Sequence, residues 1–299
     1  MDNPIEKAII KLLKIVGKFA LFALITVIIA LSCTAALLLL VDQNELFTAL
    51  SSSLTAENIT YNSLFYSCIA IGQLLAMLLI YQLIEQKPFS AMGFGRKDSL
   101  RQFSIGAAWG IGLIGGIFLL LLATGLIQIE SVQFHWLTLF EFALFFVLVA
   151  LTEELIFRPF AINMLSDAYG DWAALIVSSI LFALVHTSNP SYDWIPFVSI
   201  FLGGVVMGIL YLKTRQIWYP LGFHLTWNFF QGNIFGFEVS GLSTNSLLTV
   251  SKSDYPLLTG GDFGLEGSIL GVLALCACIA YYRADLKKIV ERKELVTND

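Results

Sequence analysis

Eight long apolar runs constrain the fold of this chain more than any other feature. The runs lie at about 19–41, 63–84, 103–127, 137–157, 172–186, 194–212, 217–231 and 265–282. A helix needs roughly 20 apolar residues to cross the core of a bilayer, and most of the runs approach or exceed that length. The sequence therefore predicts an all-α polytopic membrane protein with about eight transmembrane helices. The fifth and seventh runs are short for a span, and Pro220 lies in the seventh.

Basic residues predict the orientation of these helices. With the N-terminus in the cytoplasm, 16 of the 17 lysines and arginines fall in cytoplasmic segments, and only Lys252 falls in an outer loop. The first apolar run is too long for a signal peptide and lacks a small-residue cleavage site, so we expect a retained anchor. We expect a multi-pass protein of a bacterial plasma membrane with both termini in the cytoplasm. The expected partners are the lipid bilayer and a membrane-associated peptide or protein substrate; the basic residues form no patch typical of nucleic-acid binding.

The pattern of runs and loops divides the chain into three parts. Residues 1–136 hold helices one to three, 137–231 hold a core of helices four to seven, and 232–299 hold an outer loop, the last helix and a charged tail. Small residues four apart allow close contact between helices in lipid, which predicts helix contacts at three pairs of glycines. These pairs are Gly106/Gly110, Gly112/Gly116 and Gly204/Gly208.

The stretch 152-TEELIFRPF-160 places two carboxylates and an arginine in apolar surroundings. Ionisable groups at membrane depth are costly, so each needs a partner or a function. On a helix Glu154 and Arg158 are i, i+4 neighbours and can pair. Glu153 points about 100° away and has no partner in its own turn. It therefore needs a group from another helix, unless it is an interfacial acid that reaches water.

Two of the three histidines lie in late apolar runs. His186 shares a helical face with Phe182, and His224 shares one with Asn228, because each pair is four residues apart. A lone histidine on an apolar face is usually a packed core residue. Two of them together with an unpaired glutamate favour a functional cluster.

The turn between helices four and five predicts which residues meet. Residues at equal depth in an antiparallel hairpin have a constant index sum, and pairing Glu153 with His186 places the hairpin centre between Tyr169 and Gly170. That point lies inside the turn-like stretch 166-SDAYGD-171. The pairing requires helix four to continue past Pro159.

These residues resemble the motifs of the CAAX protease and bacteriocin-processing family, also called the Abi family, which is related to the type II CAAX prenyl protease. Its EExxxR motif corresponds to Glu153, Glu154 and Arg158. Its FxxxH motif corresponds to Phe182 and His186, and its HxxxN motif to His224 and Asn228. The resemblance covers about residues 137–231.

The resemblance implies peptide-bond hydrolysis inside the membrane, and the residue types suit that chemistry. We assign Glu153 as the general base for water and Arg158 as the partner of Glu154, which orients the site. We expect His186 to position the water or carry its proton, and His224 and Asn228 to donate hydrogen bonds to the oxyanion.

Metal dependence and function class stay open at this stage. Glu153, His186 and His224 would also make a zinc set with an open position, although the sequence has no HExxH. We favour a metal-free site with Zn²⁺ as the alternative. A non-catalytic membrane protein of bacteriocin immunity or processing is the main rival. A small proton-coupled transporter is the second rival, and an inverted repeat of broken helices would distinguish it.

Overall fold

The computed structural model describes residues 4–51, 55 and 57–296, and these residues are mostly helical. The α-helices are α1 (Pro4–Leu37), α2 (Gln43–Ser51), α3 (Ile59–Leu79), α4 (Ser99–Ala123), α5 (Trp136–Leu155), α6 (Asn163–Val185), α7 (Trp194–Thr214), α8 (Trp218–Phe229), α9 (Pro256–Thr259), α10 (Ile269–Tyr281) and α11 (Arg283–Val296). The π-helical segments are η1 (Ile80–Ile84), η3 (Ile156–Ile162) and η4 (Phe230–Ile234). The 3₁₀ turns are η2 (Phe89–Met92), η5 (Gly261–Phe263) and η6 (Leu265–Gly267).

The number of membrane-spanning helices differs from the prediction of eight. Within the described residues four helical segments are long and apolar enough to cross a membrane: Ile9–Leu37, Ile59–Ile84, Ser99–Ala123 and Trp194–Thr214. Helices α10 and α11, bent by 65° at their junction, give a fifth candidate if they are counted as one span. The chain is thus a mostly helical protein with four or five candidate spans. The seventh run shows one reason for the difference, because α8 has only 12 residues.

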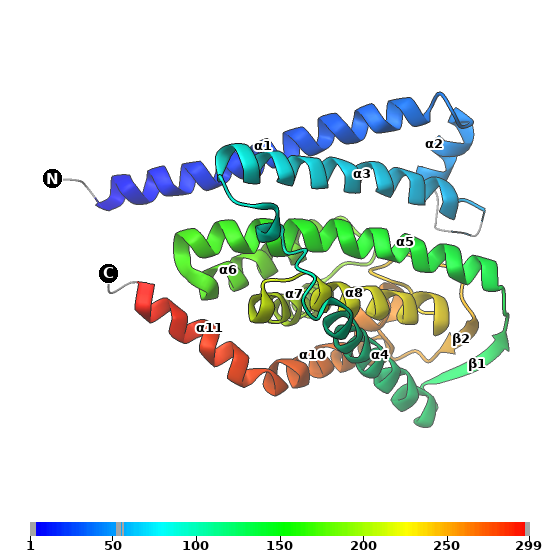
Figure 1. The fold of residues 1–299 in the computed structure, drawn as a ribbon. Coiled ribbons are helices and arrows are strands. Elements are labelled where there is room, and N and C mark those ends of the chain that lie inside the picture. Colours follow the sequence, from blue (N-terminus) through cyan, green and yellow to red (C-terminus); the bar gives the residue numbers. More distant parts are fainter. Residues whose placement is uncertain (1–3, 52–54, 56, 297–299) are drawn as a thin grey trace.

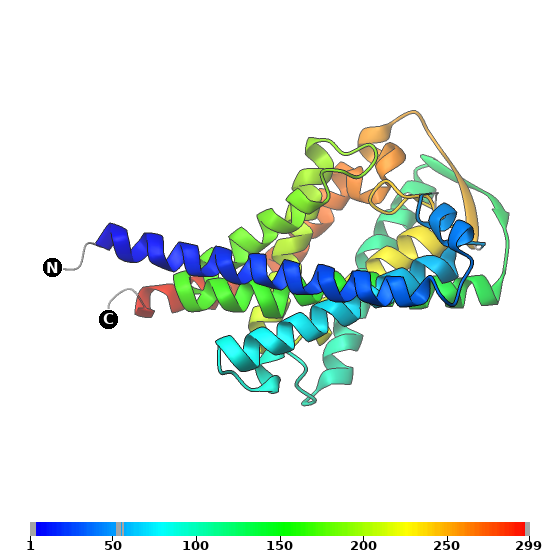
Figure 2. The ribbon, with the colours of Figure 1, turned by 90° about the horizontal axis from the view of Figure 1, so that it is seen from above.

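The helices form a layer over a bundle (Figures 1 and 2). Helices α1 and α3 lie side by side and form the layer, which rests on α5. Below α5, α8 packs closely against α4, and α7 packs against both α6 and α10. Helix α5 is therefore central, because it contacts the layer on one side and α8 on the other.

The predicted hairpin around residue 170 is confirmed, but its first arm is longer than the run 137–157 indicated. The helix continues from α5 through η3 into the first part of α6 and breaks at Gly170, whose φ of 81° and ψ of 164° are non-helical. The π-helical segment accommodates Pro159, and the Tyr81 hydroxyl donates a hydrogen bond to the carbonyl of Pro159. The remainder of α6 runs back from Gly170 toward His186.

This extension changes the position of Glu153. The continuous helix from Trp136 to Tyr169 is about 50 Å long at 1.5 Å per residue. Glu153 lies 17 residues after Trp136 and 16 before Tyr169, at the middle of this helix. It lies at mid-length because the helix continues past Pro159, as the predicted pairing of Glu153 with His186 required.

Two of the three glycine pairs make the predicted helix contacts. A Cβ on Gly106 would lie 2.1 Å from the carbonyl oxygen of Tyr219, and one on Gly208 would lie 2.4 Å from Leu175. These glycines allow α4 to approach α8 and α7 to approach α6. The prediction is wrong for Gly112 and Gly116, which have nothing within 4 Å of a Cβ. They lie in the same helix as Gly106 but on a face that meets no other described part of the chain.

A small sheet departs from the all-α prediction. Strands β1 (Ile127–Val132) and β2 (Leu248–Lys252) pair antiparallel, with Ile127 opposite Lys252 and Val132 opposite Leu248. The two segments are far apart in the sequence, and both lie in predicted outer loops. Their pairing holds the long segment after α8 against the end of α4 (Figure 1). The sequence predicted this segment only as an outer loop.

Ion pairs and hydrogen bonds between elements join segments that were predicted to lie on the same side of the membrane. Four ion pairs join segments predicted to be cytoplasmic, namely Lys18 with Glu85, Lys87 with Asp167, Arg215 with Asp171, and Lys213 with Asp285. Contacts between predicted outer segments include Tyr61 with Glu45 and Asn189 with the carbonyl of Ser240. Helix α1 begins and α11 ends at the same end of the molecule (Figures 1 and 2).

Candidate active site

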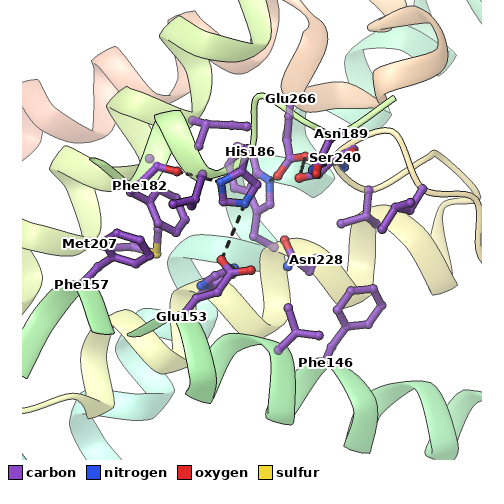
Figure 3. Close-up of a pocket in the computed structure, with 18 of the residues that line it drawn as sticks. Phe146, Glu153, Phe157, Phe182, His186, Asn189, Met207, Asn228, Ser240 and Glu266 are labelled. Atoms are coloured by element: carbon purple, nitrogen blue, oxygen red, sulfur yellow. Dashed lines mark hydrogen bonds and ion pairs between the residues drawn. The ribbon is translucent and has the colours of Figure 1, made fainter. Parts of the chain in front are cut away.

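The polar residues of the three motifs meet around one cavity. It has a volume of about 310 Å³ and a mainly apolar lining with several polar groups. Glu153 enters from α5, His186 from the C-cap position directly after α6, and His224 and Asn228 from α8. Figure 3 shows Glu153, His186 and Asn228 directed into this space. The structure thus brings together the pair expected from the hairpin, Glu153 and His186, and the pair expected to share one helical face, His224 and Asn228.

The second glutamate of the motif holds two groups at once. The Nε of Arg158 donates to Glu154 Oε2 at 2.8 Å, and both side chains are 0% exposed. The other oxygen, Oε1, lies 2.9 Å from Nδ1 of His224. Glu154 thus links η3 to α8 in addition to making the predicted pair with Arg158. Because it is enclosed by these partners, it does not line the cavity.

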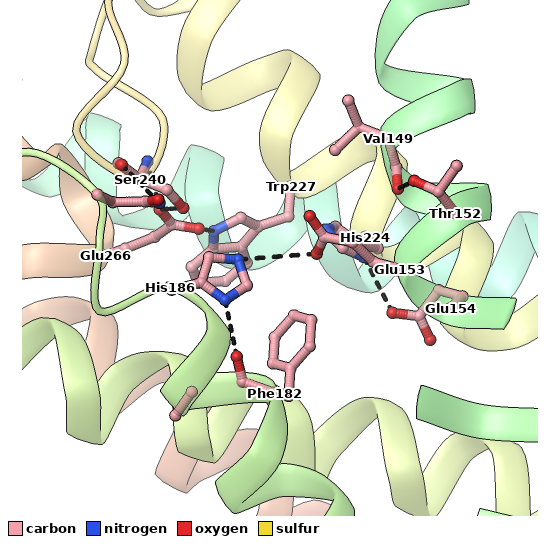
Figure 4. Close-up of polar contacts among 12 residues, drawn as sticks. Val149, Thr152, Glu153, Glu154, Phe182, His186, His224, Trp227, Ser240 and Glu266 are labelled. Atoms are coloured by element: carbon pink, nitrogen blue, oxygen red, sulfur yellow. Dashed lines mark hydrogen bonds and ion pairs between the residues drawn. The ribbon is translucent and has the colours of Figure 1, made fainter. Parts of the chain in front are cut away.

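Glu153 has the opposite environment. Its side chain is 27% exposed and lines the cavity. Its Oε2 lies 3.7 Å from Nε2 of His186 and 3.7 Å from Nε2 of His224 (Figure 4). These distances are too long for direct hydrogen bonds. The predicted cross-helix partners of Glu153 are present, and a single oxygen faces both of them.

Both imidazoles are anchored through Nδ1. Nδ1 of His186 lies 2.7 Å from the carbonyl oxygen of Phe182, and Nδ1 of His224 lies 2.9 Å from the Glu154 carboxylate. A carbonyl or a carboxylate only accepts, so we assign the hydrogen to Nδ1 in each ring. The Nε2 atoms facing Glu153 are therefore the ones available to gain or lose a proton.

Phe182 packs against three of the charged or titratable groups. Its ring centroid is 4.9 Å from that of His186 and 6.0 Å from that of His224. The guanidinium of Arg158 lies 5.2 Å from the same ring, within cation–π range. Nη1 and Nη2 of Arg158 make no hydrogen bond to any described residue, so this ring is a main contact of the rest of the guanidinium. The phenylalanine thus contacts both imidazoles and the guanidinium of the fully buried Arg158.

The three candidate metal ligands do not form a complete site. Glu153, His186 and His224 surround the same region, but the described residues contain no group of three or more His, Cys, Asp or Glu side chains that could hold a metal ion. We therefore derive no chemical step through a metal.

A comparison with family models supports the resemblance seen in the motifs. Residues 134–230 match the family described as type II CAAX prenyl endopeptidase Rce1-like. The chain contains an Rce1-like domain of the CAAX protease family. This domain spans α5 to α8 and includes all six predicted site residues, and its family implies a protease. Together with the apolar helices it indicates an integral membrane protein, which fits the expected lipid bilayer and a membrane-associated substrate. No curated protein and no solved structure matches the chain.

Sequence reasoning missed polar residues of the cavity both inside and outside the Rce1-like domain. Ser240 and Glu266 come from the segment after α8 and line the same cavity, and Asn189 lines it from the loop after α6. Glu266 lies at the start of the last apolar run, which we interpreted as helix from residue 265. Helix α10 begins only at Ile269, and Glu266 lies in the preceding turn η6. The sequence did carry one signal for this part of the cavity, namely Glu266 itself, an acidic residue within an apolar run.

Replacing Arg158 tests the importance of the buried pair. Arg158→Ala removes the cation beside a carboxylate that is 0% exposed, so we expect the variant to lose about 3–5 kcal/mol of stability. Lys213→Ala is the matched control. It breaks a pair whose side chains are 36% and 23% exposed, which should cost about 1 kcal/mol or less. The measurement is the folded fraction after heating in detergent, by size-exclusion chromatography. Equal losses in both variants would contradict this account of Glu154.

Proposed function

We propose that the chain is an intramembrane endopeptidase that hydrolyses peptide bonds of membrane-associated peptides or proteins with a water activated by Glu153. The observation that supports this most is the position of Glu153 Oε2, which faces Nε2 of both His186 and His224 inside a cavity of an Rce1-like domain. A carboxylate and two imidazoles supply the proton acceptor and the proton carriers that hydrolysis requires.

In the proposed reaction Glu153 accepts a proton from water as the water oxygen attacks the carbonyl carbon. Attack forms a tetrahedral intermediate with a negative oxygen. The carbon–nitrogen bond then breaks, and the leaving nitrogen takes up the proton that Glu153 removed from the water, either directly or through Nε2 of His186. Glu153 is then ionised again, and the new carboxylic acid gives its remaining proton to the amine, so that the products are a carboxylate and an ammonium group. The gap of 3.7 Å between Oε2 and each Nε2 leaves these atoms free to contact a reacting molecule.

The remaining residues stabilise charge and orientation in this proposal. His224, protonated on Nε2 as well as Nδ1, and Asn228 donate to the negative oxygen; such a donor contributes about 3 kcal/mol in well-studied proteases. Glu154 holds the Nδ1 of His224. Arg158 compensates the charge of Glu154, so this carboxylate orients the histidine without acting as a second base.

We further propose that the end of the molecule where α1 begins and α11 ends faces the cytoplasm of a bacterial cell. The same-side ion pairs near that end and the excess of basic residues support this orientation. The outermost residues, 1–3 and 297–299, lie outside the described residues. Bacteriocin processing is one setting for such an enzyme, and immunity without cleavage is the alternative function.

Replacing the base tests the proposed function. Glu153→Gln preserves size but cannot accept the proton, so cleavage should fall at least about a hundredfold while the protein stays folded. Glu141→Gln is the matched control, because Glu141 lies on the same helix and does not line the cavity. The measurement compares membrane peptides from cells that express each variant. Normal cleavage by Glu153→Gln would reject Glu153 as the base, and the same peptides in every strain would favour the immunity function.

Chelation tests metal-free catalysis. Purified protein should keep its full rate after exhaustive chelation, because the proposed chemistry uses only the protein's side chains. The matched measurement is the zinc content of the unsubstituted protein and of His186→Ala and His224→Ala. About one equivalent of zinc, lost together with activity and restored by added metal, would show that the histidines are metal ligands.

Reporter fusions test the orientation. Fusions after Arg101 and Lys213 should report the cytoplasm, and fusions at Glu57 and Lys252 should report the outside. In chain order, from Glu57 through Arg101 and Lys213 to Lys252, the expected readings are outside, cytoplasm, cytoplasm and outside. A cytoplasmic reading at Lys252 would reverse the orientation of the segment that contains β2.

A further inference from the structure

The cavity has a second carboxylate that the proposed reaction does not use. Glu266 is 9% exposed, and its oxygens accept hydrogen bonds from Trp227 Nε1 at 3.2 Å and from the backbone N–H and hydroxyl of Ser240, both at 2.8 Å. All three donors are neutral. No lysine, arginine or histidine among the described residues forms an ion pair with it. A carboxylate offers about four acceptor positions, so Glu266 can take one more donor.

Glu266 lies at the opposite end of the site from the proposed base. In both close-up views His186 lies between Glu266 and Glu153 (Figures 3 and 4). Ser199 of α7 also lines the cavity; it is 1% exposed, and its hydroxyl has no hydrogen-bond partner among the described residues. No lysine or arginine lines the cavity. The cavity therefore combines a buried carboxylate that is not used by the proposed reaction with an unused hydroxyl inside mainly apolar walls.

We propose that Glu266 is the specificity residue of a subsite that binds a lysine or arginine side chain of the substrate. A buried carboxylate with only neutral donors gains most from a cation, because charge-assisted hydrogen bonds are the strong ones in a poorly hydrated place. The apolar walls suit the methylene stem of such a side chain. This inference rests on the proposed endopeptidase function and adds one feature of its substrate.

Glu266 also holds a tight turn, and the test must separate that role from charge recognition. Val239 and Leu242 form an isolated bridge, and between them Ser240 and Gly241 have φ values of 50° and 82°. Glu266 binds this turn through Ser240, and Val239, Ser240 and Leu242 all line the cavity. Ser240→Ala removes one of the two bonds to the turn and leaves the charge. Glu266→Gln removes the charge and keeps the size.

The experiment measures peptide binding to Glu153→Gln protein in nanodiscs, so that no peptide is consumed. The probes are dansyl-labelled farnesylated peptides of one sequence, with Lys, Met or Glu placed in turn at each of the four positions next to the prenylated cysteine. At one position we expect the Lys peptide to bind roughly tenfold or more tightly than the Met peptide, and the Glu peptide to bind most weakly. Adding Glu266→Gln to the Glu153→Gln protein should bring the ratio of the affinities for the Lys and Met peptides close to one. Adding Ser240→Ala should leave that ratio unchanged.

Three results would overturn the subsite. The first is equal binding of the Lys and Met peptides at every position, and the second is a preference for the Lys peptide that survives Glu266→Gln. The third is a preference for the Lys peptide that is lost in Ser240→Ala as fully as in Glu266→Gln, which would make Glu266 a support for the turn only. Failure of all probes to bind would also overturn it. Cleavage of the same peptides by the chain with Glu153 intact is scored separately, so loss of the endopeptidase function and loss of the subsite are distinguishable.

Discussion

The site depends on one fully buried ion pair, Glu154 with Arg158. Two charges that are 0% exposed persist only with good geometry and further hydrogen bonds, and here the carboxylate also binds His224 while the guanidinium stacks on Phe182. The pair therefore joins α5 and η3 to α6 and α8, the elements that carry the site. Among the described contacts of the His224 ring, the hydrogen bond to Glu154 is the one that determines which nitrogen faces Glu153.

The two adjacent glutamates differ because the helix turns them into different surroundings. Glu154 points into protein and is compensated by Arg158, whereas Glu153 points into the cavity, where its Oε2 lies 3.7 Å from an imidazole nitrogen of His186 and of His224. A carboxylate that already holds a cation is a poor proton acceptor. We therefore place the chemistry on Glu153 and the orientation of the site on Glu154, although the two residues are neighbours in sequence.

The predictable features of the site follow from local helix geometry, and the missed ones depend on the tertiary fold. Four-residue spacing predicted the Glu154–Arg158 pair, and the turn at Gly170 predicted the meeting of Glu153 with His186. Spacing could not show that Gly112 faces no helix, since that depends on which neighbour packs on α4. Glu266 and the β1–β2 pair were missed because they come from segments that are remote in sequence and that hydropathy marks only as loops or helix.

The central claim is that Glu153 removes a proton from water and does not itself attack the substrate. A single turnover in H₂¹⁸O with enzyme in excess, followed by mass spectrometry of the new C-terminal carboxylate, tests this claim most directly. Attack by water predicts one ¹⁸O atom in the product carboxylate of the first turnover and no ¹⁸O in Glu153. Product carboxylate that carries ¹⁶O from the protein, with ¹⁸O appearing in Glu153, would show a covalent acyl intermediate on this residue and would contradict the account.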